Sequence, residues 1–333
     1  MRRRRGAVLV TGGAGYVGSF AVRALLARGE RVVVFDDLSK GHRAAVPRGV
    51  PLVVGRVQDG RRLRRVLAER RFDAVLHFAA HAYVGESVLE PWKYWENNLG
   101  GTLSLVGAAL DAGVPGFVLS STCAVYGEPR TRRIPESAPR APVNPYGRSK
   151  AACEALLEDL DSVGAMRSFR LRYFNAAGAA ADGSLGEDHE PETHLLPLAL
   201  RAAARGTALR VFGRDYPTPD GTCVRDYVHV EDLADAHAAA VERLRGGHRG
   251  GALNLGTGRG ASVLEVARAA EEVTGRRVRT VAAPRRPGDP PFLVAAPGRA
   301  REVLGWVPRY RTVGEIAATA WEWHRRRPRG FAR

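Results

Sequence analysis

The feature that most constrains the fold of this chain is a glycine-rich turn near its amino terminus. Ala7 to Thr11 is a short apolar run, and it leads directly into Thr11-Gly-Gly-Ala-Gly-Tyr-Val-Gly18. Residues 17–27 then repeat apolar side chains with the period of a helix, and Gly29 ends the pattern. Glycine permits the tight turn and positive φ angles, and it lets the helix pack closely against the strand. The sequence therefore predicts a strand–turn–helix unit at the start of an α/β fold.

Strand and helix patterns continue to alternate through the first half of the chain. Further short apolar runs suit strands that are buried on both faces, and they occupy residues 32–35, 73–78, 116–121 and 168–174. Helical patterns over residues 99–112 and 146–160 lie between these strands. This alternation predicts an α/β fold with a doubly wound parallel sheet of the Rossmann type.

The glycine turn also carries a ligand-binding pattern. Gly12, Gly15 and Gly18 are spaced three apart where the first helix begins, and backbone N–H groups there can approach a pyrophosphate. Asp36 ends the second strand, and a carboxylate at that place accepts hydrogen bonds from the adenosine ribose and repels a 2′-phosphate. These residues predict a dinucleotide site with NAD, rather than NADP, as the cofactor. The alternative is a structural turn followed by a chance aspartate.

After Asn175 the regular alternation ends. A helix over 232–244 and a short strand over 252–255 follow, and the strand suits a return to the main sheet. The sequence thus predicts two domains. The NAD-binding Rossmann domain comprises residues 1–178 with 222–258, and a smaller mixed C-terminal domain for the substrate comprises residues 179–221 with 259–333.

Tyr146 and Lys150 form the strongest candidate for a catalytic pair. They lie four residues apart at the start of a predicted helix and so share one face of it. A neighbouring ammonium favours the phenolate, so we expect Lys150 to lower the pKa of Tyr146 from about 10 toward neutrality and make it a general base. Thr122 follows the strand over 116–121, where its hydroxyl can relay the proton to Tyr146. The alternative is a surface tyrosine that stacks on a helical lysine.

Composition excludes several classes of protein. The formal net charge is +16, but the arginines are spread along the chain without an aromatic-interleaved basic face, so we expect a phosphate-bearing small substrate and no nucleic-acid partner. No apolar run reaches the roughly 18 residues that a membrane span requires, so we expect no membrane partner. Three cysteines without metal spacing predict neither disulfides nor a metal site. The Gly-rich start lacks the pattern of a cleaved signal, and we expect a cytoplasmic location.

Further motifs run over nearly the whole chain. They are Gly12–Gly18, His77–Ala80, Val84–Ser87, Tyr146–Lys150, Arg172–Asn175, Phe212–Pro217, Val224–His229, Asn254–Thr257 and Arg285–Asp289. Together they resemble the extended short-chain dehydrogenase/reductase family, and the later motifs resemble its sugar-nucleotide epimerases.

This resemblance implies an NAD-dependent epimerase that inverts C4 of a UDP-hexose through a transient 4-keto sugar, and that assembles as a homodimer through two helices. It implies that Tyr146 takes the C4 hydroxyl proton with help from Thr122, and that Lys150 also holds the nicotinamide ribose. The implied cofactor residues are Gly12, Gly15, Tyr16, Val17, Gly18, Asp36, Phe78, Ala79, Ala80, Asn97, Tyr146, Lys150 and Tyr173. The implied UDP-sugar residues are Thr122, Asn175, His194, Leu195, Phe212, Arg225, Arg286, Asp289 and Leu293.

Some positions depart from the family pattern or leave alternatives open. Arg56 stands where the family usually has an aspartate that contacts adenine, and Asp59 is a candidate substitute. Leu293 stands where some members have a bulky tyrosine, which keeps N-acetyl sugars open as substrates. Cys123 and Ala124 replace the Asp-Glu pair of related 4,6-dehydratases and argue against that reaction. UDP-pentoses and UDP-uronates remain alternative substrates, and a regulatory protein that senses NAD is the alternative outside enzymes.

Overall fold

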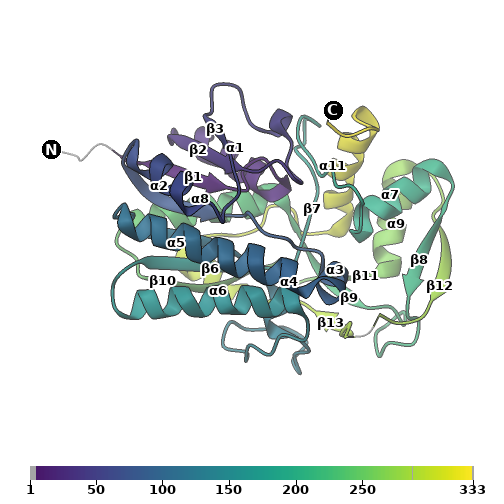
Figure 1. Ribbon diagram of the computed structural model, residues 1–333. Helices are drawn as coiled ribbons and strands as arrows, with labels where there is room; N and C mark the ends of the chain where they lie inside the picture. The colour runs from purple at the N-terminus through teal and green to yellow at the C-terminus, as the bar shows by residue number, and fades with distance from the viewer. Residues whose placement is uncertain (1–4, 287, 332–333) are drawn as a thin grey trace.

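The computed structural model describes residues 5–286 and 288–331 and is built around one parallel sheet (Figure 1). The sheet has seven strands in the order β10-β6-β5-β4-β1-β2-β3, and each neighbouring pair is parallel. The strands are β1 (Ala7–Thr11), β2 (Val32–Asp36), β3 (Leu52–Val54), β4 (Phe72–His77), β5 (Gly116–Thr122), β6 (Arg167–Tyr173) and β10 (Gly250–Leu255). The predicted doubly wound parallel sheet is confirmed, and the strand near residue 252 does return to it.

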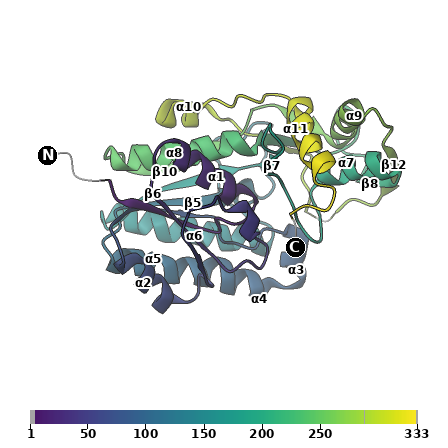
Figure 2. The ribbon, with the colours of Figure 1, turned by 90° about the horizontal axis from the view of Figure 1, so that it is seen from above.

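Helices cover both faces of the sheet (Figure 2). One face carries α1 (Tyr16–Ala27), α8 (Val230–Arg245) and α10 (Gly298–Leu304), and the other carries α2 (Gly60–Ala68), α5 (Gly101–Asp111) and α6 (Pro145–Ser162). Side chains of a strand alternate between the faces, so Val8 and Val10 enter the core beneath α1 and α8 while Leu9 enters the core beneath α2 and α5. Because each central strand contributes side chains to a core on both faces of the sheet, nearly all of its residues are apolar.

A smaller mixed part lies beyond the carboxyl ends of the strands, on the right in Figure 1. It contains helices α7 (Leu195–Arg205), α9 (Val263–Thr274) and α11 (Val313–Arg326), which pack around a third core. Its strands are β7 (Asn175–Ala177), β8 (Ala208–Phe212), β9 (Val224–His229), β11 (Gly260–Ser262), β12 (Arg279–Ala283) and β13 (Phe292–Leu293). β9 pairs with β7, β11 and β13, and β8 pairs with β12, so segments far apart in the sequence meet here.

Short elements complete the fold. They are η1 (Arg43–Ala45), α3 (Val84–Leu89), α4 (Pro91–Tyr94), the π-helical turn η2 (Trp95–Gly100) and η3 (Cys123–Tyr126). The helix predicted over 99–112 therefore begins within a π turn, a geometry that sequence periodicity does not reveal. Among the described residues, no helix combines the length and the apolar character that crossing a bilayer requires.

Candidate active site

The glycine turn between β1 and α1 fits a pyrophosphate. Gly12 has a φ angle of 72°, and a Cβ there would lie 2.4 Å from the backbone nitrogen of Ala79. A Cβ on Gly18 would lie 2.1 Å from the carbonyl oxygen of Gly12. Gly15 is the N-cap of α1, so no side chain of the described residues caps its first N–H groups, and Val17 is half-buried in the first turn. Such a helix start binds anions, and the residues present suit a dinucleotide.

Asp36 lies at the end of β2, as predicted, and is 6% exposed. Its Oδ2 accepts a hydrogen bond from the Ala14 N–H at 2.9 Å, and its Oδ1 accepts one from the Leu38 N–H at 2.8 Å. Burial raises the pKa of Asp36, and these hydrogen bonds oppose the rise. A carboxylate oxygen has two lone pairs, so each oxygen can still accept from a ribose hydroxyl.

The adenine side of the site remains without a clear acidic partner. Arg56 is exposed just beyond β3. Asp59, the candidate substitute, is the N-cap of α2 and accepts from the Arg62 N–H at 3.0 Å. The cap uses Oδ1 of Asp59, so its Oδ2 can still accept a hydrogen bond from an adenine amino group.

The loop after β4 is held directly against the glycine turn. The N–H groups of Phe78 and Ala79 donate to the carbonyl of Thr11 at 2.8 and 3.2 Å, and Ala80 follows them. The Phe78 ring lies 4.6 Å from the ring of buried His237 on α8. The predicted cofactor residues 78–80 thus lie beside Gly12 in space although they are distant in sequence.

Other predicted cofactor residues lie near the carboxyl ends of the parallel strands. Tyr173 ends β6, and its hydroxyl hydrogen-bonds Ser120 of β5. Asn97 lies in the π turn η2, which packs against α6. Tyr16 begins α1, and its hydroxyl donates to the carbonyl of Gly178 at 2.6 Å.

The predicted catalytic residues are brought together at the carboxyl end of β5. Asn144 caps α6 by accepting from the Gly147 N–H at 2.8 Å, and this places Tyr146 and Lys150 on the first turns of the helix. Lys150 is 2% exposed, and its Nζ donates to the carbonyl of Ser120 at 2.9 Å. Tyr146 is 9% exposed and is hydrogen-bonded by the side chain of Thr122. The tyrosine therefore lies inside the protein and not on its surface.

The expected acidity of Tyr146 is not borne out by its surroundings. Burial raises its pKa, the nearby Tyr173 raises it further, and the hydrogen bond from Thr122 only partly opposes the rise. Burial also lowers the pKa of Lys150. The prediction that Lys150 brings the pKa of the phenol toward neutrality is therefore wrong, because burial raises that pKa and the Lys150 ammonium is turned to the carbonyl of Ser120.

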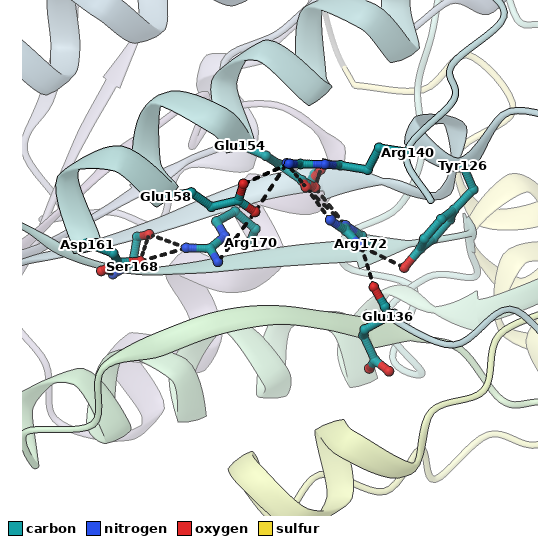
Figure 3. A network of polar contacts seen from close by, with 10 residues as sticks. Tyr126, Glu136, Arg140, Glu154, Glu158, Asp161, Ser168, Arg170 and Arg172 are labelled. Atoms are coloured by element: carbon teal, nitrogen blue, oxygen red, sulfur yellow. Dashed lines mark hydrogen bonds and ion pairs between the residues drawn. The ribbon is translucent and has the colours of Figure 1, made fainter. Parts of the chain in front are cut away.

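A buried polar network holds α6 against the sheet (Figure 3). Glu154 lies one turn after Lys150 and has a fully buried side chain. It accepts from Arg172 of β6, with Nη2 at 2.5 Å from Oε2, and from the hydroxyl of Ser121 on β5. Arg172 also donates to the hydroxyl of Tyr126 at 2.9 Å. The network fixes the helix of Tyr146 and Lys150 relative to the strand of Thr122, and the sequence patterns did not reveal Glu154.

Three predicted substrate residues meet on the smaller sheet. β13 pairs with β9 so that Leu293 lies beside Arg225. Arg225 forms an ion pair with Asp289. Leu293 also packs against the buried cluster that contains Cys123, the residue that follows Thr122. The predicted substrate and catalytic residues thus adjoin.

The other predicted substrate residues surround the same sheet. Asn175 begins β7, which pairs with β9. Leu195 begins α7 and packs with Tyr216. The guanidinium carbon of Arg286 lies 4.0 Å from the centre of the Phe212 ring at the end of β8.

His194 lies in a cluster that the motifs did not predict. The segment before α7 reads Glu187-x-His189-x-x-Glu192-x-His194, a spacing visible in the sequence after the regular alternation ends. Burial lowers the pKa of His194, but Glu187 and Glu192 together raise it to about 10. The cluster therefore attracts positive charge.

Comparison with known proteins agrees with this site. Residues 8–256 match the model of the NAD dependent epimerase/dehydratase family. A UDP-glucose 4-epimerase of Rhizobium meliloti (strain 1021) is 52% identical over 324 residues, which cover 97% of this chain and 98% of that protein. The UDP-glucose 4-epimerase of Brucella ovis in complex with NAD has a TM-score of 0.91 and 47% identity, covering 95% of this chain and 97% of the other.

A third relative holds a sugar nucleotide as well. The UDP-glucose-4-epimerase of Stenotrophomonas maltophila, solved with NAD and formylated UDP-arabinopyranose, has a TM-score of 0.94 and 41% identity, covering 98% of this chain and 99% of the other. The glycine turn, the buried Tyr146 and Lys150 and these full-length similarities lead to one conclusion. The chain belongs to the NAD-dependent epimerase/dehydratase family.

Proposed function

We propose that this protein inverts C4 of a UDP-hexose, interconverting UDP-glucose and UDP-galactose through a transient 4-keto sugar with bound NAD. The main support for the proposal is that Tyr146, Lys150 and Thr122 lie together at the carboxyl ends of the parallel strands. The glycine turn lies at the same end of the sheet. Full-length relatives named UDP-glucose 4-epimerase support the choice of reaction. A regulatory protein that only senses NAD would have no need of this buried pair.

In this mechanism Tyr146 is the proton acceptor for the C4 hydroxyl. When bound, NAD would accept a hydride from C4 and return it, and its oxidised nicotinamide would add a positive charge to the site. That additional charge matters because the phenol is buried and its pKa is raised. Thr122 donates a hydrogen bond to Tyr146 and so stabilises the phenolate as the proton moves. Lys150, anchored by the carbonyl of Ser120, holds the nicotinamide ribose and keeps a cation beside the reacting atoms.

The UDP part of the substrate would be held by the smaller sheet. Arg225 and Arg286 are suited to a diphosphate, because guanidinium groups form charge-assisted hydrogen bonds with phosphate oxygens. Arg225 already pairs with Asp289, so its side chain is oriented before substrate arrives. Asn175, Leu195 and Phe212 would complete the site from β7, α7 and β8. The domain division stays a prediction from the sequence, although β7 and β9, which it assigns to the Rossmann domain, pair within the smaller sheet.

A second substrate pair is favoured by one residue. Leu293 is half-buried on β13 and packs beside Phe174 and Ala295. A leucine is smaller than tyrosine, so the sugar subsite would accept an N-acetyl group as well as a hydroxyl. We therefore include the UDP-N-acetylhexosamines as the alternative substrate pair.

We also propose a homodimer, as the family resemblance implies. Large apolar side chains are exposed on neighbouring elements before and within α5: Val88 (62%), Leu89 (82%), Trp92 (76%) and Leu103 (50%). Burying such side chains against a second copy would remove apolar surface from water. The cytoplasmic location stays a prediction from the sequence.

The test is to purify the protein, release its nucleotide with acid and assay interconversion of the two sugar pairs. We expect about one NAD per chain and turnover of UDP-galactose to UDP-glucose without added cofactor. If only the N-acetyl pair is interconverted, the substrates are the UDP-N-acetylhexosamines and not UDP-glucose and UDP-galactose. Bound NAD with no turnover of either pair would contradict the proposal and favour the regulatory reading.

A further inference from the structure

Four potential metal ligands converge in the segment that precedes α7. Glu187, His189, Glu192 and His194 each present one ligand atom, and these four atoms all lie within 4.8 Å of one another. They form the one group of this kind among residues 5–286 and 288–331. The cluster contains two imidazoles and two carboxylates within eight residues, and it includes none of Tyr146, Lys150 and Thr122. His194 is also one of the predicted UDP-sugar residues.

The separations between these atoms suit a small tetrahedral cation. Glu187 Oε1 lies 3.0 Å from His189 Nδ1 and 2.6 Å from His194 Nδ1. Glu192 Oε1 lies 3.3 Å from His194 Nδ1. Zinc bonds to nitrogen and oxygen are about 2.0–2.2 Å, so tetrahedral ligand atoms stand roughly 3.3 Å apart. The 3.0 and 3.3 Å separations lie within a few tenths of an ångström of that value, and the 2.6 Å separation would open by roughly 0.7 Å on metal binding.

Burial and a missing partner provide a second, independent observation. The side chains of Glu187 and Glu192 are only 4% and 1% exposed. Glu192 Oε2 is buried and finds no hydrogen-bond partner among the residues the structure describes. The nearest guanidinium nitrogen to Glu192 Oε2 is Nη2 of Arg201, at 3.9 Å. Buried carboxylates are costly unless positive charge lies beside them, so the cluster favours a cation, either a metal ion or a proton on His194.

We propose that Glu187, His189, Glu192 and His194 bind a divalent transition metal of the zinc type as a closed structural site. Imidazole nitrogen selects such metals, whereas magnesium and calcium prefer sites built from oxygen alone. The site goes beyond the proposed epimerase reaction and does not depend on it. It also departs from the sequence-based prediction, which considered cysteine spacing and found no metal site. The alternative is that no metal binds and that a proton on His194 supplies the positive charge.

The contacts of this segment define what the metal would stabilise. The carbonyl of Glu187 accepts from Trp323 Nε1 of α11 at 2.9 Å, and the carbonyl of Glu190 accepts from Lys40 Nζ at 2.8 Å. His194 is the N-cap of α7. A metal would therefore fasten the connection between the Rossmann part and the smaller part, directly before the predicted substrate residue Leu195.

The experiment uses the full-length protein without a histidine tag. Metal content is measured as purified, and the chelator-stripped protein is then titrated with Zn²⁺ against a competing chromophoric chelator. We expect one Zn²⁺ per chain and a higher Tm on reloading. We expect His189→Gln to weaken Zn²⁺ binding more than about 100-fold, because even outer-shell partners of metal ligands are worth 10–100-fold. His248→Gln, a half-buried histidine outside the cluster, should bind Zn²⁺ like the unsubstituted protein.

Replacement by Co²⁺ gives a readout that does not depend on the stability of a variant. A tetrahedral nitrogen and oxygen site should produce the intense visible absorption of four-coordinate cobalt in the unsubstituted protein. Failure of that protein to bind Zn²⁺, or equal binding by His189→Gln, would overturn the proposal and leave a protonated His194 as the occupant.

Discussion

The two sides of the candidate site are built in different ways. On the cofactor side, Tyr146 and Lys150 lie one turn apart on a single helix, and Glu154 one turn further on ties that helix to β5 and β6. On the substrate side, Arg225 and Asp289 lie 64 residues apart and meet because β9 pairs with β13. The cofactor side is thus a buried, locally encoded unit, whereas the substrate side is assembled from distant, more exposed segments. Substitutions on the first side should therefore affect stability and kcat, and those on the second should affect KM.

The largest effect on stability should come from the buried network on the cofactor side. Glu154→Ala leaves Arg172 buried without its partner, which should cost about 3–5 kcal/mol of unfolding free energy. The matched control is Glu158→Ala on the same helix, where the side chain is 35% exposed and pairs with Arg140 at 2.8 Å. That change should cost less than about 1 kcal/mol. Denaturant unfolding of both variants tests the difference, and equal losses would show that burial does not distinguish the two pairs.

The next effect is a dependence of stability on pH that also arises on the cofactor side. Burial lowers the pKa of His237 to about 4, so between about pH 6.5 and pH 4 the unfolded chain binds a proton that the folded chain does not. Stability from this group is complete above pH 6.5 and is lost as the pH falls through that window. Between about pH 6.5 and pH 4, His237→Leu should reduce the loss of unfolding free energy by about 3 kcal/mol, because each pH unit of the window contributes roughly 1.36 kcal/mol.

Unfolding at several pH values measures this change. His248→Gln serves as the control, because His248 is only half-buried and should leave most of the loss in place. Identical pH profiles for His237→Leu and the unsubstituted protein would contradict a neutral buried His237.

On the substrate side, Arg225→Gln should raise KM for the UDP-sugar by about 10–100-fold with little change in kcat, because a charge-assisted hydrogen bond to phosphate is lost. The fold should persist, since Asp289 is partly exposed and can be solvated. Arg301→Gln, an exposed arginine on α10, should leave KM unchanged. A fall in kcat with constant KM would place Arg225 among the groups that act on the reacting atoms instead.

The smallest expected effect concerns the sugar itself. Leu293→Tyr should reduce kcat/KM for the N-acetyl pair about 10-fold relative to the hexose pair, since a change in apolar pocket size is worth roughly 1–3 kcal/mol. The two ratios are measured side by side with the same enzyme preparation. An unchanged ratio would remove Leu293 from the sugar subsite.

The same contrast explains how far the sequence alone could reach. Local patterns predicted the strands, the glycine turn, Asp36 and the helix of Tyr146 and Lys150, because each depends on neighbours in the chain. The pKa of Tyr146 was predicted in the wrong direction, because helix spacing shows neither the burial of the phenol nor that Lys150 Nζ is turned to the carbonyl of Ser120. Glu154 was missed because its partners on β5 and β6 come from tertiary contacts that periodicity cannot supply. The cluster around His194 is contiguous in the sequence, and it was missed because its spacing matches none of the motifs considered.

The most direct test of the account is Tyr146→Phe, which removes only the hydroxyl. Loss of a general base typically costs 10²–10⁴-fold, so kcat should fall by about that factor while acid release still yields one NAD per chain. Tyr310→Phe is the control, because that hydroxyl donates to Glu231 at 3.1 Å, away from β5. A Tyr146→Phe enzyme with a kcat near that of the unsubstituted protein would contradict the account.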